Sequence, residues 1–251
     1  MVPLVTGAGP PVTVVAHGLG GSVADTRPLV GAVTGTRVFP CARGHGGTPL
    51  GEGPHDYASL GRDLESVADA HGATQAMGVS MGAGALLSLL ARRPDRFERV
   101  VLLLPTAVDR PRADAAVLGR PGLADALDAG DDAGVAAAVA RELPEDLHDV
   151  PGVRGYLAAR AAHLRSSPGL ATLARALPAA VPVTDRGALT AVTAEVLLLA
   201  QEDDAVHPAQ VARDLAAVLP RTRLVVFAQA GAAVRERARL RALVGAFLSP
   251  S

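Results

Sequence analysis

Short, almost uninterrupted apolar runs alternate along this chain with longer stretches of helical spacing, and this alternation most constrains the fold. The runs that we expect to form strands are residues 12–16, 37–41, 75–79, 100–104, 196–200 and 224–227. Because apolarity continues through each run without alternation, both faces of each strand must be covered, as in a parallel sheet. The expected helices are residues 25–33, 57–71, 82–93, 208–219 and 234–248. Alternation of this kind predicts an α/β sheet with right-handed crossovers.

Residues 106–194 break this rhythm, because no convincing strand occurs among them. The segment is rich in alanine, contains seven prolines, and has helical spacing over residues 134–142 and 153–165. It is too apolar and too periodic to be a linker. We therefore expect residues 1–105 and 195–251 to form one core domain, and residues 106–194 to form a helical cap inserted into it.

Composition excludes several functional classes. The formal net charge is −1, so no strong field attracts nucleic acid or an anionic membrane. A single cysteine, Cys41, excludes an intramolecular disulfide and a cysteine-based metal cluster. The start of the chain has no basic stretch before an apolar run, and no apolar run is long enough to span a membrane. We expect a cytoplasmic protein without nucleic-acid or membrane partners, and its oligomeric state stays open.

The pentapeptide Gly78-Val79-Ser80-Met81-Gly82 fits the pattern G-x-S-x-G and lies between an expected strand and an expected helix. A serine on so sharp a turn needs neighbours without side chains, so that strand and helix can approach each other. Its hydroxyl then projects from the carboxyl edge of the sheet, near the amino end of a helix. This context favours Ser80 as a nucleophile over an ordinary glycine-rich turn.

A second glycine-rich segment, His17-Gly18-Leu19-Gly20-Gly21-Ser22, follows the first long strand. Backbone N–H groups in such a loop can face an oxyanion. A phosphate-binding loop is the alternative, but the chain has neither of the usual glycine patterns and contains no lysine to complete a P-loop.

These segments, together with Arg-Gly-His-Gly-Gly-Thr at residues 43–48 and Gln-Glu-Asp-Asp-Ala-Val-His-Pro at residues 201–208, resemble the α/β-hydrolase superfamily over nearly the whole chain. The resemblance implies an α/β-hydrolase fold: a mostly parallel sheet with helices on both faces and a helical cap insertion. It also implies a serine nucleophile that needs no cofactor and no metal ion. Carried over by position, Ser80 is the nucleophile, backbone N–H groups of Leu19 and Met81 form the oxyanion hole, and Asp204 is the triad acid, with Asp203 as the weaker alternative.

The expected pocket is lined by aliphatic cap side chains and suits a small apolar acyl-type substrate. The resemblance places His17, Gly18 and His45 close to the site, where we expect them to contact substrate together with Tyr156. Four cap arginines could bind an anionic substrate end or simply lie on solvated helix faces: Arg110, Arg112, Arg154 and Arg160.

The family places its catalytic histidine in the loop after the last strand, where this chain has Ala232. No histidine follows His207 in the sequence. Three interpretations stay open: an engineered chain with alanine at this position, a natural member that has lost the base, or a chain in which another histidine substitutes. His207, three residues after Asp204, is the best substitute base, although a histidine that merely caps the loop before Pro208 is the more ordinary interpretation.

The leading functional hypothesis is a serine hydrolase that acts on an ester, thioester or lactone, inactive as given if the base is truly absent. The alternatives are a degenerate binding protein and a base-free cyclase that shapes a reactive substrate. If Ala232 marks a vacant base position, Ala232→His should raise hydrolysis of an activated ester by roughly 10²-fold or more. If His207 already serves as the base, the same change should gain little.

Overall fold

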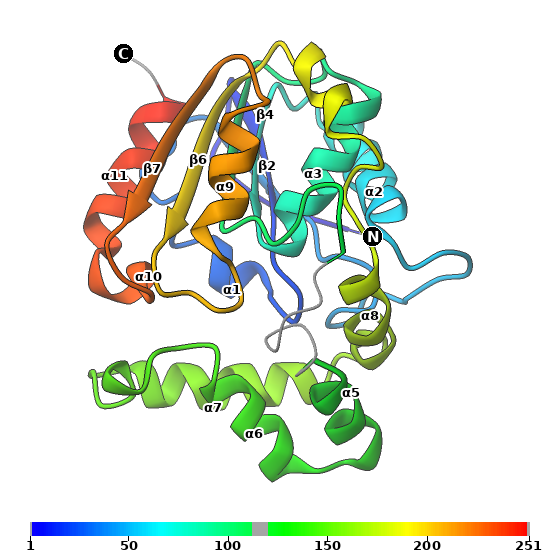
Figure 1. Ribbon diagram of the computed structural model, residues 1–251, viewed down its shortest axis with the longest axis vertical. Coiled ribbons are helices and arrows are strands. Elements are labelled where there is room, and N and C mark those ends of the chain that lie inside the picture. Colours follow the sequence, from blue (N-terminus) through cyan, green and yellow to red (C-terminus); the bar gives the residue numbers. More distant parts are fainter. Residues whose placement is uncertain (1, 112–119, 250–251) are drawn as a thin grey trace.

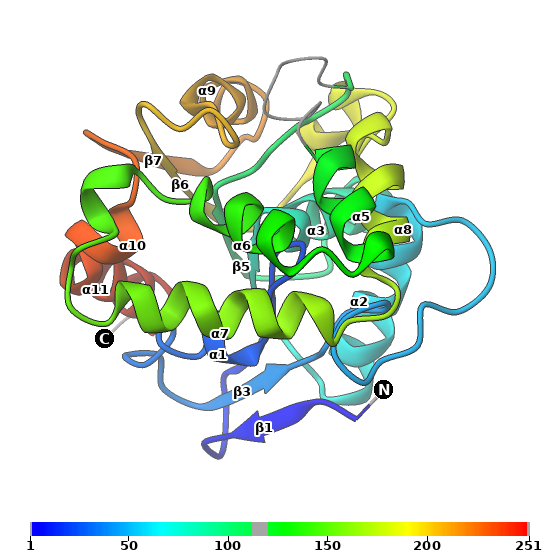
Figure 2. The same ribbon diagram turned by 90° about the horizontal axis from the view of Figure 1, so that it is seen from below.

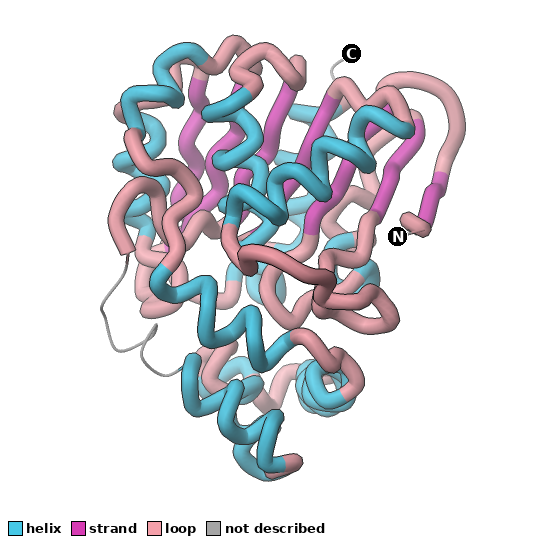
Figure 3. Tube along the Cα trace, turned by 90° about the vertical axis from the view of Figure 1, so that its right-hand side faces the viewer, coloured by secondary structure: helices cyan, strands magenta, loops and turns pink. Residues whose placement is uncertain are grey.

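The computed structural model describes residues 2–111 and 120–249. At its centre is a seven-stranded sheet with the strand order β1-β3-β2-β4-β5-β6-β7 (Figures 1 and 3). All neighbouring pairs are parallel except β1 and β3, which pair antiparallel at one edge. The strands are β1 Leu4–Thr6, β2 Val12–Ala16, β3 Thr36–Phe39, β4 Gln75–Val79, β5 Arg99–Leu103, β6 Glu195–Gln201 and β7 Thr222–Phe227. The expected, mostly parallel α/β sheet is confirmed.

Side-chain alternation explains why these strands read as continuous apolar runs. In β5, Val100 and Leu102 belong to the core on one face of the sheet, whereas Val101 and Leu103 belong to the core on the other face. Successive residues of a strand point to opposite faces, so a strand covered on both sides must be apolar throughout. Strand β1 was not expected, because Leu4 and Val5 are exposed at the sheet edge and form no such buried run.

Helices cover both faces of the sheet. One face carries α2 Tyr57–Ala70, α3 Met81–Arg92 and α9 Ala209–Ala216, and the other carries α11 Arg237–Leu248 (Figure 1). The expected helix over residues 25–33 is shorter, because α1 Val23–Thr26 ends after a single turn. The expected helix over residues 234–248 divides into α10 Ala232–Arg235 and α11, which meet at Glu236.

Between β5 and β6, the described residues form helices and no strand. They are α5 Arg120–Ala129, α6 Asp132–Ala140, α7 Val153–Arg165 and α8 Leu170–Ala176, with one short 3₁₀ helix between α6 and α7 and two after α8. Helices α5, α6 and α7 lie beyond the carboxyl edge of the sheet and cross in front of it when viewed from below (Figures 1 and 2). They share a small core that includes Val135, Val139, Ala161 and Leu164.

The last part of the insertion packs differently from these cap helices. Val183, Leu189 and Val192 belong to the main hydrophobic core, beside α3.

None of the helices in the described part of the chain combines the length and the apolar character that a membrane span requires.

Candidate active site

Ser80 occupies a sharp turn between the end of β4 and the start of α3. Its φ of 51° and ψ of −108° lie in a region that residues other than glycine rarely adopt. Its backbone N–H donates to the carbonyl of Leu103 over 2.9 Å, which helps to hold the turn. A Cβ atom at Gly82 would lie 2.5 Å from the carbonyl oxygen of Ala16. The turn therefore requires glycine at position 82, as the pattern predicts.

The imidazole ring of His207 is within hydrogen-bond distance of the Ser80 hydroxyl. Its Nε2 atom lies 2.9 Å from Ser80 Oγ, and its Nδ1 atom lies 3.0 Å from Asp204 Oδ2. Because a carboxylate only accepts hydrogen bonds, Nδ1 carries the proton and the Nε2 lone pair faces the serine hydroxyl. The structure therefore brings together Ser80, His207 and Asp204, whereas a histidine that only caps the loop would not reach Ser80.

The Asp204 carboxylate accepts four hydrogen bonds. Oδ1 accepts from the backbone N–H groups of Val206 and His207, at 2.8 and 2.9 Å. Oδ2 accepts from His207 Nδ1 and from Gln201 Nε2, the latter at 2.6 Å. Burial by itself would raise the pKa of Asp204, but the hydrogen bonds and charge of His207, aided by Gln201, hold it well below its ordinary value. The weaker alternative, Asp203, is exposed and lies outside this network.

Ala232 is buried at the start of α10. It contacts the site through a hydrogen bond of its backbone N–H rather than through its side chain. Its N–H donates to Gln201 Oε1 over 3.0 Å, while the amide nitrogen of Gln201 donates to Asp204. Gln201 thus links Asp204 to Ala232, the position where the resemblance places a histidine. Sequence reasoning missed Gln201; the only signal was a polar residue at the end of an apolar strand.

The N–H groups of Leu19 and Met81 are the two expected to form an oxyanion hole. The N–H groups on the residues after Leu19 are engaged, Gly20 with His45 Nε2 at 2.8 Å and Gly21 with the carbonyl of Gly18 at 2.9 Å. Leu19 N–H has no acceptor among the described residues, and Met81 begins α3, where N–H groups lack helical acceptors. Both groups remain available to an oxyanion.

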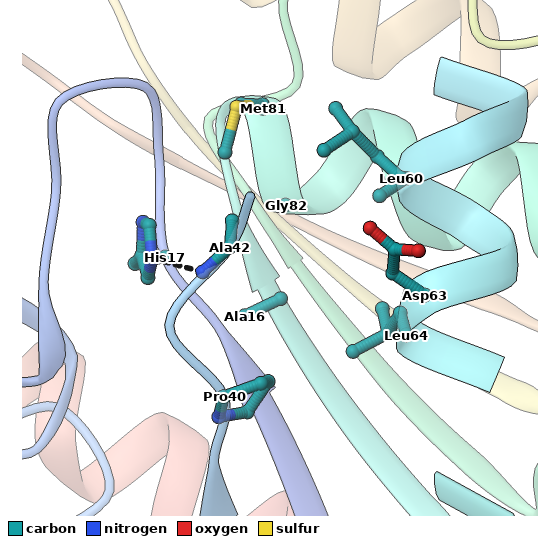
Figure 4. Close-up of a pocket in the computed structure, with 10 residues that line it drawn as sticks. Ala16, His17, Pro40, Ala42, Leu60, Asp63, Leu64, Met81 and Gly82 are labelled. Atoms are coloured by element: carbon teal, nitrogen blue, oxygen red, sulfur yellow. Dashed lines mark hydrogen bonds between the residues drawn. The ribbon is translucent and has the colours of Figure 1, made fainter. Parts of the chain in front are cut away.

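His17 and His45 do not line the main cavity, which corrects the expectation that they contact substrate. His17 Nε2 accepts from the N–H of Ala42 at 3.0 Å (Figure 4), and His45 Nε2 accepts from that of Gly20. Their Nδ1 atoms lie 2.8 and 3.0 Å from the carbonyl oxygens of Gly18 and Arg43. Burial lowers the pKa of both residues, that of His45 to about 3. They are neutral and hold the two glycine-rich loops together.

A small apolar cavity lies between His17, Met81 and α2 (Figure 4). Its volume of about 30 Å³ leaves room for about two water molecules and not for a substrate.

The substrate-sized cavity lies between Ser80 and the cap, with a volume of about 530 Å³. Gly18 and Tyr156 line it, as expected, and so do Ser80 and His207. Its other lining residues include seven large aliphatic side chains and four charged ones: Leu19, Leu29, Val79, Leu123, Leu143, Leu164 and Val206, and Asp25, Arg141, Glu142 and Arg160. The pocket is therefore less uniformly apolar than the sequence suggested.

Of the four cap arginines considered for binding an anionic substrate end, those that the structure describes do not form one cluster, and their surroundings differ. Arg160 is partly buried and paired with Glu142, whereas Arg154 pairs with Asp149 on the surface. Arg110 is exposed, and Arg112 lies outside the described residues. Within the described ranges, no group of three or more His, Cys, Asp or Glu residues is placed to hold a metal ion.

A family model described as the alpha/beta hydrolase fold matches residues 11–234. An enol-lactonase from Burkholderia xenovorans LB400 superposes with a TM-score of 0.81 at 21% identity, covering 98% of this chain and 95% of that one. A hydrolase from Pseudomonas aeruginosa PA01 gives 0.78 at 26% identity, covering 98% and 93%. A thermophilic esterase from Thermogutta terrifontis gives 0.78 at 20% identity, covering 97% and 90%. The likeness to the lactonase and the esterase is one of fold.

Proposed function

The chain belongs to the alpha/beta hydrolase fold family, and on that premise we propose that it is a cofactor-independent serine hydrolase of carboxylic esters, thioesters or lactones. The observation that carries the proposal is the hydrogen-bonded series Ser80–His207–Asp204, with distances of 2.9 and 3.0 Å. A catalytic triad is defined by geometry and roles rather than by the order of its members in the sequence. His207 therefore takes the place of the absent histidine at position 232.

In the acylation step, Ser80 Oγ attacks the carbonyl carbon while its proton passes to His207 Nε2. Asp204 holds the ring in the required tautomer and stabilises the imidazolium that forms. Negative charge develops on the carbonyl oxygen, and the N–H groups of Leu19 and Met81 donate to it. When the tetrahedral intermediate collapses, the bond to the leaving oxygen or sulfur breaks, and that atom takes the proton from Nε2.

Deacylation repeats these steps with water as the nucleophile. His207 Nε2 takes a proton from water as the water oxygen attacks the acyl carbon. The same two N–H groups stabilise the second oxyanion. The Ser80 ester bond then breaks, the imidazolium returns its proton to Ser80 Oγ, and a carboxylic acid leaves.

The cavity supports a small, mainly apolar acyl group as the substrate class. Its volume of about 530 Å³ is in the range of small-molecule sites, and most of its lining surface is apolar. The similar folds include proteins described as an enol-lactonase and an esterase, which favours ester and lactone carbonyls as the reacting group.

Labelling with a fluorophosphonate tests the proposal, because the reagent reports an activated serine. We expect stoichiometric labelling of Ser80 in the parent, none in Ser80→Ala, and labelling roughly 10²-fold slower in His207→Ala. His71→Ala is the matched control, because His71 lies at the C-terminal end of α2 and outside the main cavity lining. Hydrolysis of p-nitrophenyl butyrate should follow the same order. A parent that neither labels nor turns over would favour a binding protein, and turnover that survives Ser80→Ala would favour a base-free cyclase.

A further inference from the structure

One cap helix holds three consecutive carbonyl groups of the loop that follows β2. From α7, Arg160 Nη2 donates to the carbonyl of Leu19 over 3.2 Å, and Arg160 Nη1 donates to that of Gly20 over 2.9 Å. His163 Nε2, one helical turn further on, lies 3.2 Å from the carbonyl of Gly21. These two side chains therefore face the loop that carries the Leu19 N–H group.

The Arg160 guanidinium is fixed by acidic partners on its other sides. Its Nε and Nη2 atoms both donate to the carboxylate of Glu142. Asp25 Oδ2 lies 3.9 Å from Nη1, and the side chain of Arg160 is 11% exposed. A guanidinium has five N–H donors in a rigid plane, and here nearly all of them have protein acceptors. Arg160 is therefore suited to holding the loop and poorly suited to binding a substrate anion.

Within the loop, one backbone hydrogen bond joins Gly21 N–H to the carbonyl of Gly18, and the Leu19 N–H takes no part in it. Glycines at positions 18, 20 and 21 flank or follow Leu19, and glycine restricts backbone conformation least of all residues. The Leu19–Gly20 peptide is held from both sides, because its oxygen accepts from Arg160 and its N–H donates to His45. The Leu19 side chain also packs against the small core of the cap. Contacts from outside the loop thus determine where Leu19 lies.

We propose that Arg160 is a positioning residue for the oxyanion hole, through which the seated cap aligns the Leu19 N–H group with the developing charge. This inference rests on the proposed function. Because an oxyanion forms only in the transition state, loss of the alignment lowers kcat and leaves substrate affinity nearly unchanged. The cap then contributes to the chemical step as well as to the shape of the pocket.

Four variants separate this role from a general loss of stability. Arg160→Met keeps an unbranched apolar stem without the donors, and Arg160→Lys keeps the charge with fewer directed donors. Glu142→Gln leaves both arginine contacts to the loop but weakens the partner that orients the guanidinium. Arg154→Met is the matched control, because Arg154 lies on the same helix and its ion pair with Asp149 is on the surface.

Kinetics on a neutral p-nitrophenyl ester give the first measurement. Removal of one oxyanion donor typically costs 10²- to 10³-fold in kcat, so we expect Arg160→Met to lose roughly 10²-fold with KM within a few-fold of the parent. Glu142→Gln and Arg160→Lys should fall between Arg160→Met and the parent, and Arg154→Met should match the parent. Affinity for a trifluoromethyl ketone, which forms a tetrahedral adduct on Ser80, should fall by the same factor as kcat/KM. A kcat that is unchanged in Arg160→Met would overturn the proposal, as would a KM increase confined to carboxylate-bearing esters.

Hydrogen exchange gives a second measurement that does not depend on activity. We expect faster amide exchange in a peptide spanning residues 17–22 of Arg160→Met, with exchange in the central strands unchanged. Unchanged exchange in that peptide would overturn the holding role. A parent without Ser80-dependent turnover would overturn the proposed function and the catalytic part of this inference, while the exchange measurement would still decide whether Arg160 holds the loop.

Discussion

Two segments leave neighbouring strands at the same edge of the sheet, but they contribute very differently to the site. Residues 201–207 end β6 and follow it, and they supply both Asp204 and His207. Residues 228–235 follow β7, which pairs with β6, and they supply the N–H of Ala232 but no side chain to the triad. The comparison shows that one short loop can place a carboxylate and an imidazole in hydrogen-bond contact, as the proposed function requires.

The backbone of the first segment explains how one loop does both tasks. Asp204 Oδ1 accepts from the N–H groups two and three residues later, which is the hydrogen bonding of an Asx-turn. This turn brings the His207 ring next to the other carboxylate oxygen. The contacts that orient the acid therefore also place the base.

Removing the base from the first segment should have the largest effect. We expect His207→Ala to lower kcat/KM for an activated ester by roughly 10⁴-fold, the scale seen when a triad histidine cannot work as a base. Gln229→Ala, in an exposed part of the second segment, should stay within about two-fold of the parent because surface changes are mostly neutral. Equal losses in the two variants would contradict the assignment of the base to residues 201–207.

Moving the histidine to the second segment is a sharper test. In the parent, Ala232→His should gain nothing, because His207 already holds both Ser80 and Asp204. In the His207→Ala background, the same change should recover roughly 10-fold or more, since base assistance is typically worth 10²- to 10⁴-fold. Ester hydrolysis by the single and double variants measures both effects. If Ala232→His raised ester hydrolysis of the parent by 10²-fold, position 232 would be the site of a missing base and His207 would not act as the base.

The link between the two segments should contribute to stability. Gln201→Met removes a hydrogen bond to Asp204 and leaves the buried N–H of Ala232 without a partner, so we expect the free energy of unfolding to fall by about 1–3 kcal/mol at pH 7. The pKa of Asp204 should rise toward its ordinary value of 3.8.

The sign of the pH effect follows from that shift. A carboxylate whose pKa is lowered on folding stabilises the protein above pH 4 and loses this contribution as pH falls further. The difference between parent and variant should therefore shrink below pH 4 in urea unfolding experiments. Gln210→Met, which removes an exposed contact to Asp214, should have little effect at any pH. A difference that does not change with pH would place the role of Gln201 in packing alone.

The last prediction concerns His45, which contacts the loop after β2 rather than either segment. The pKa of His45 is about 3 in the folded protein and 6.5 ordinarily. As the pH falls, His45 is therefore protonated in the unfolded chain before it is protonated in the folded protein. Stability should therefore fall as pH decreases from 6.5 toward 3, by up to about 1.4 kcal/mol per pH unit. In His45→Gln, whose amide oxygen can still accept from Gly20, urea unfolding between pH 7 and pH 5 should show a shallower slope. An unchanged slope would assign this acid sensitivity to other groups.

Much of the fold follows from local sequence signals. Continuous apolar strands, the glycines around Ser80, and helices such as α7 are recognisable because each depends on periodicity or on the steric needs of one turn. Strand β1 escaped recognition because a short, exposed edge strand buries too little to leave an apolar pattern. The division of residues 234–248 into two helices also has no clear sequence signal, because apolar spacing continues across Glu236.

The sequence alone predicted Ser80 from the glycines of its turn, and the resemblance to a known family added Asp204 and the loop containing Leu19. The sequence left the identity of the base open: the base was either absent or supplied by another histidine, of which His207 was the best candidate. Only the tertiary structure placed His207 against Ser80, which lies 127 positions away in the chain, and connected Arg160 to the oxyanion loop. The physical reason is that such contacts depend on how two strand ends and one cap helix are positioned in space. No local periodicity encodes a distance between side chains from separate elements.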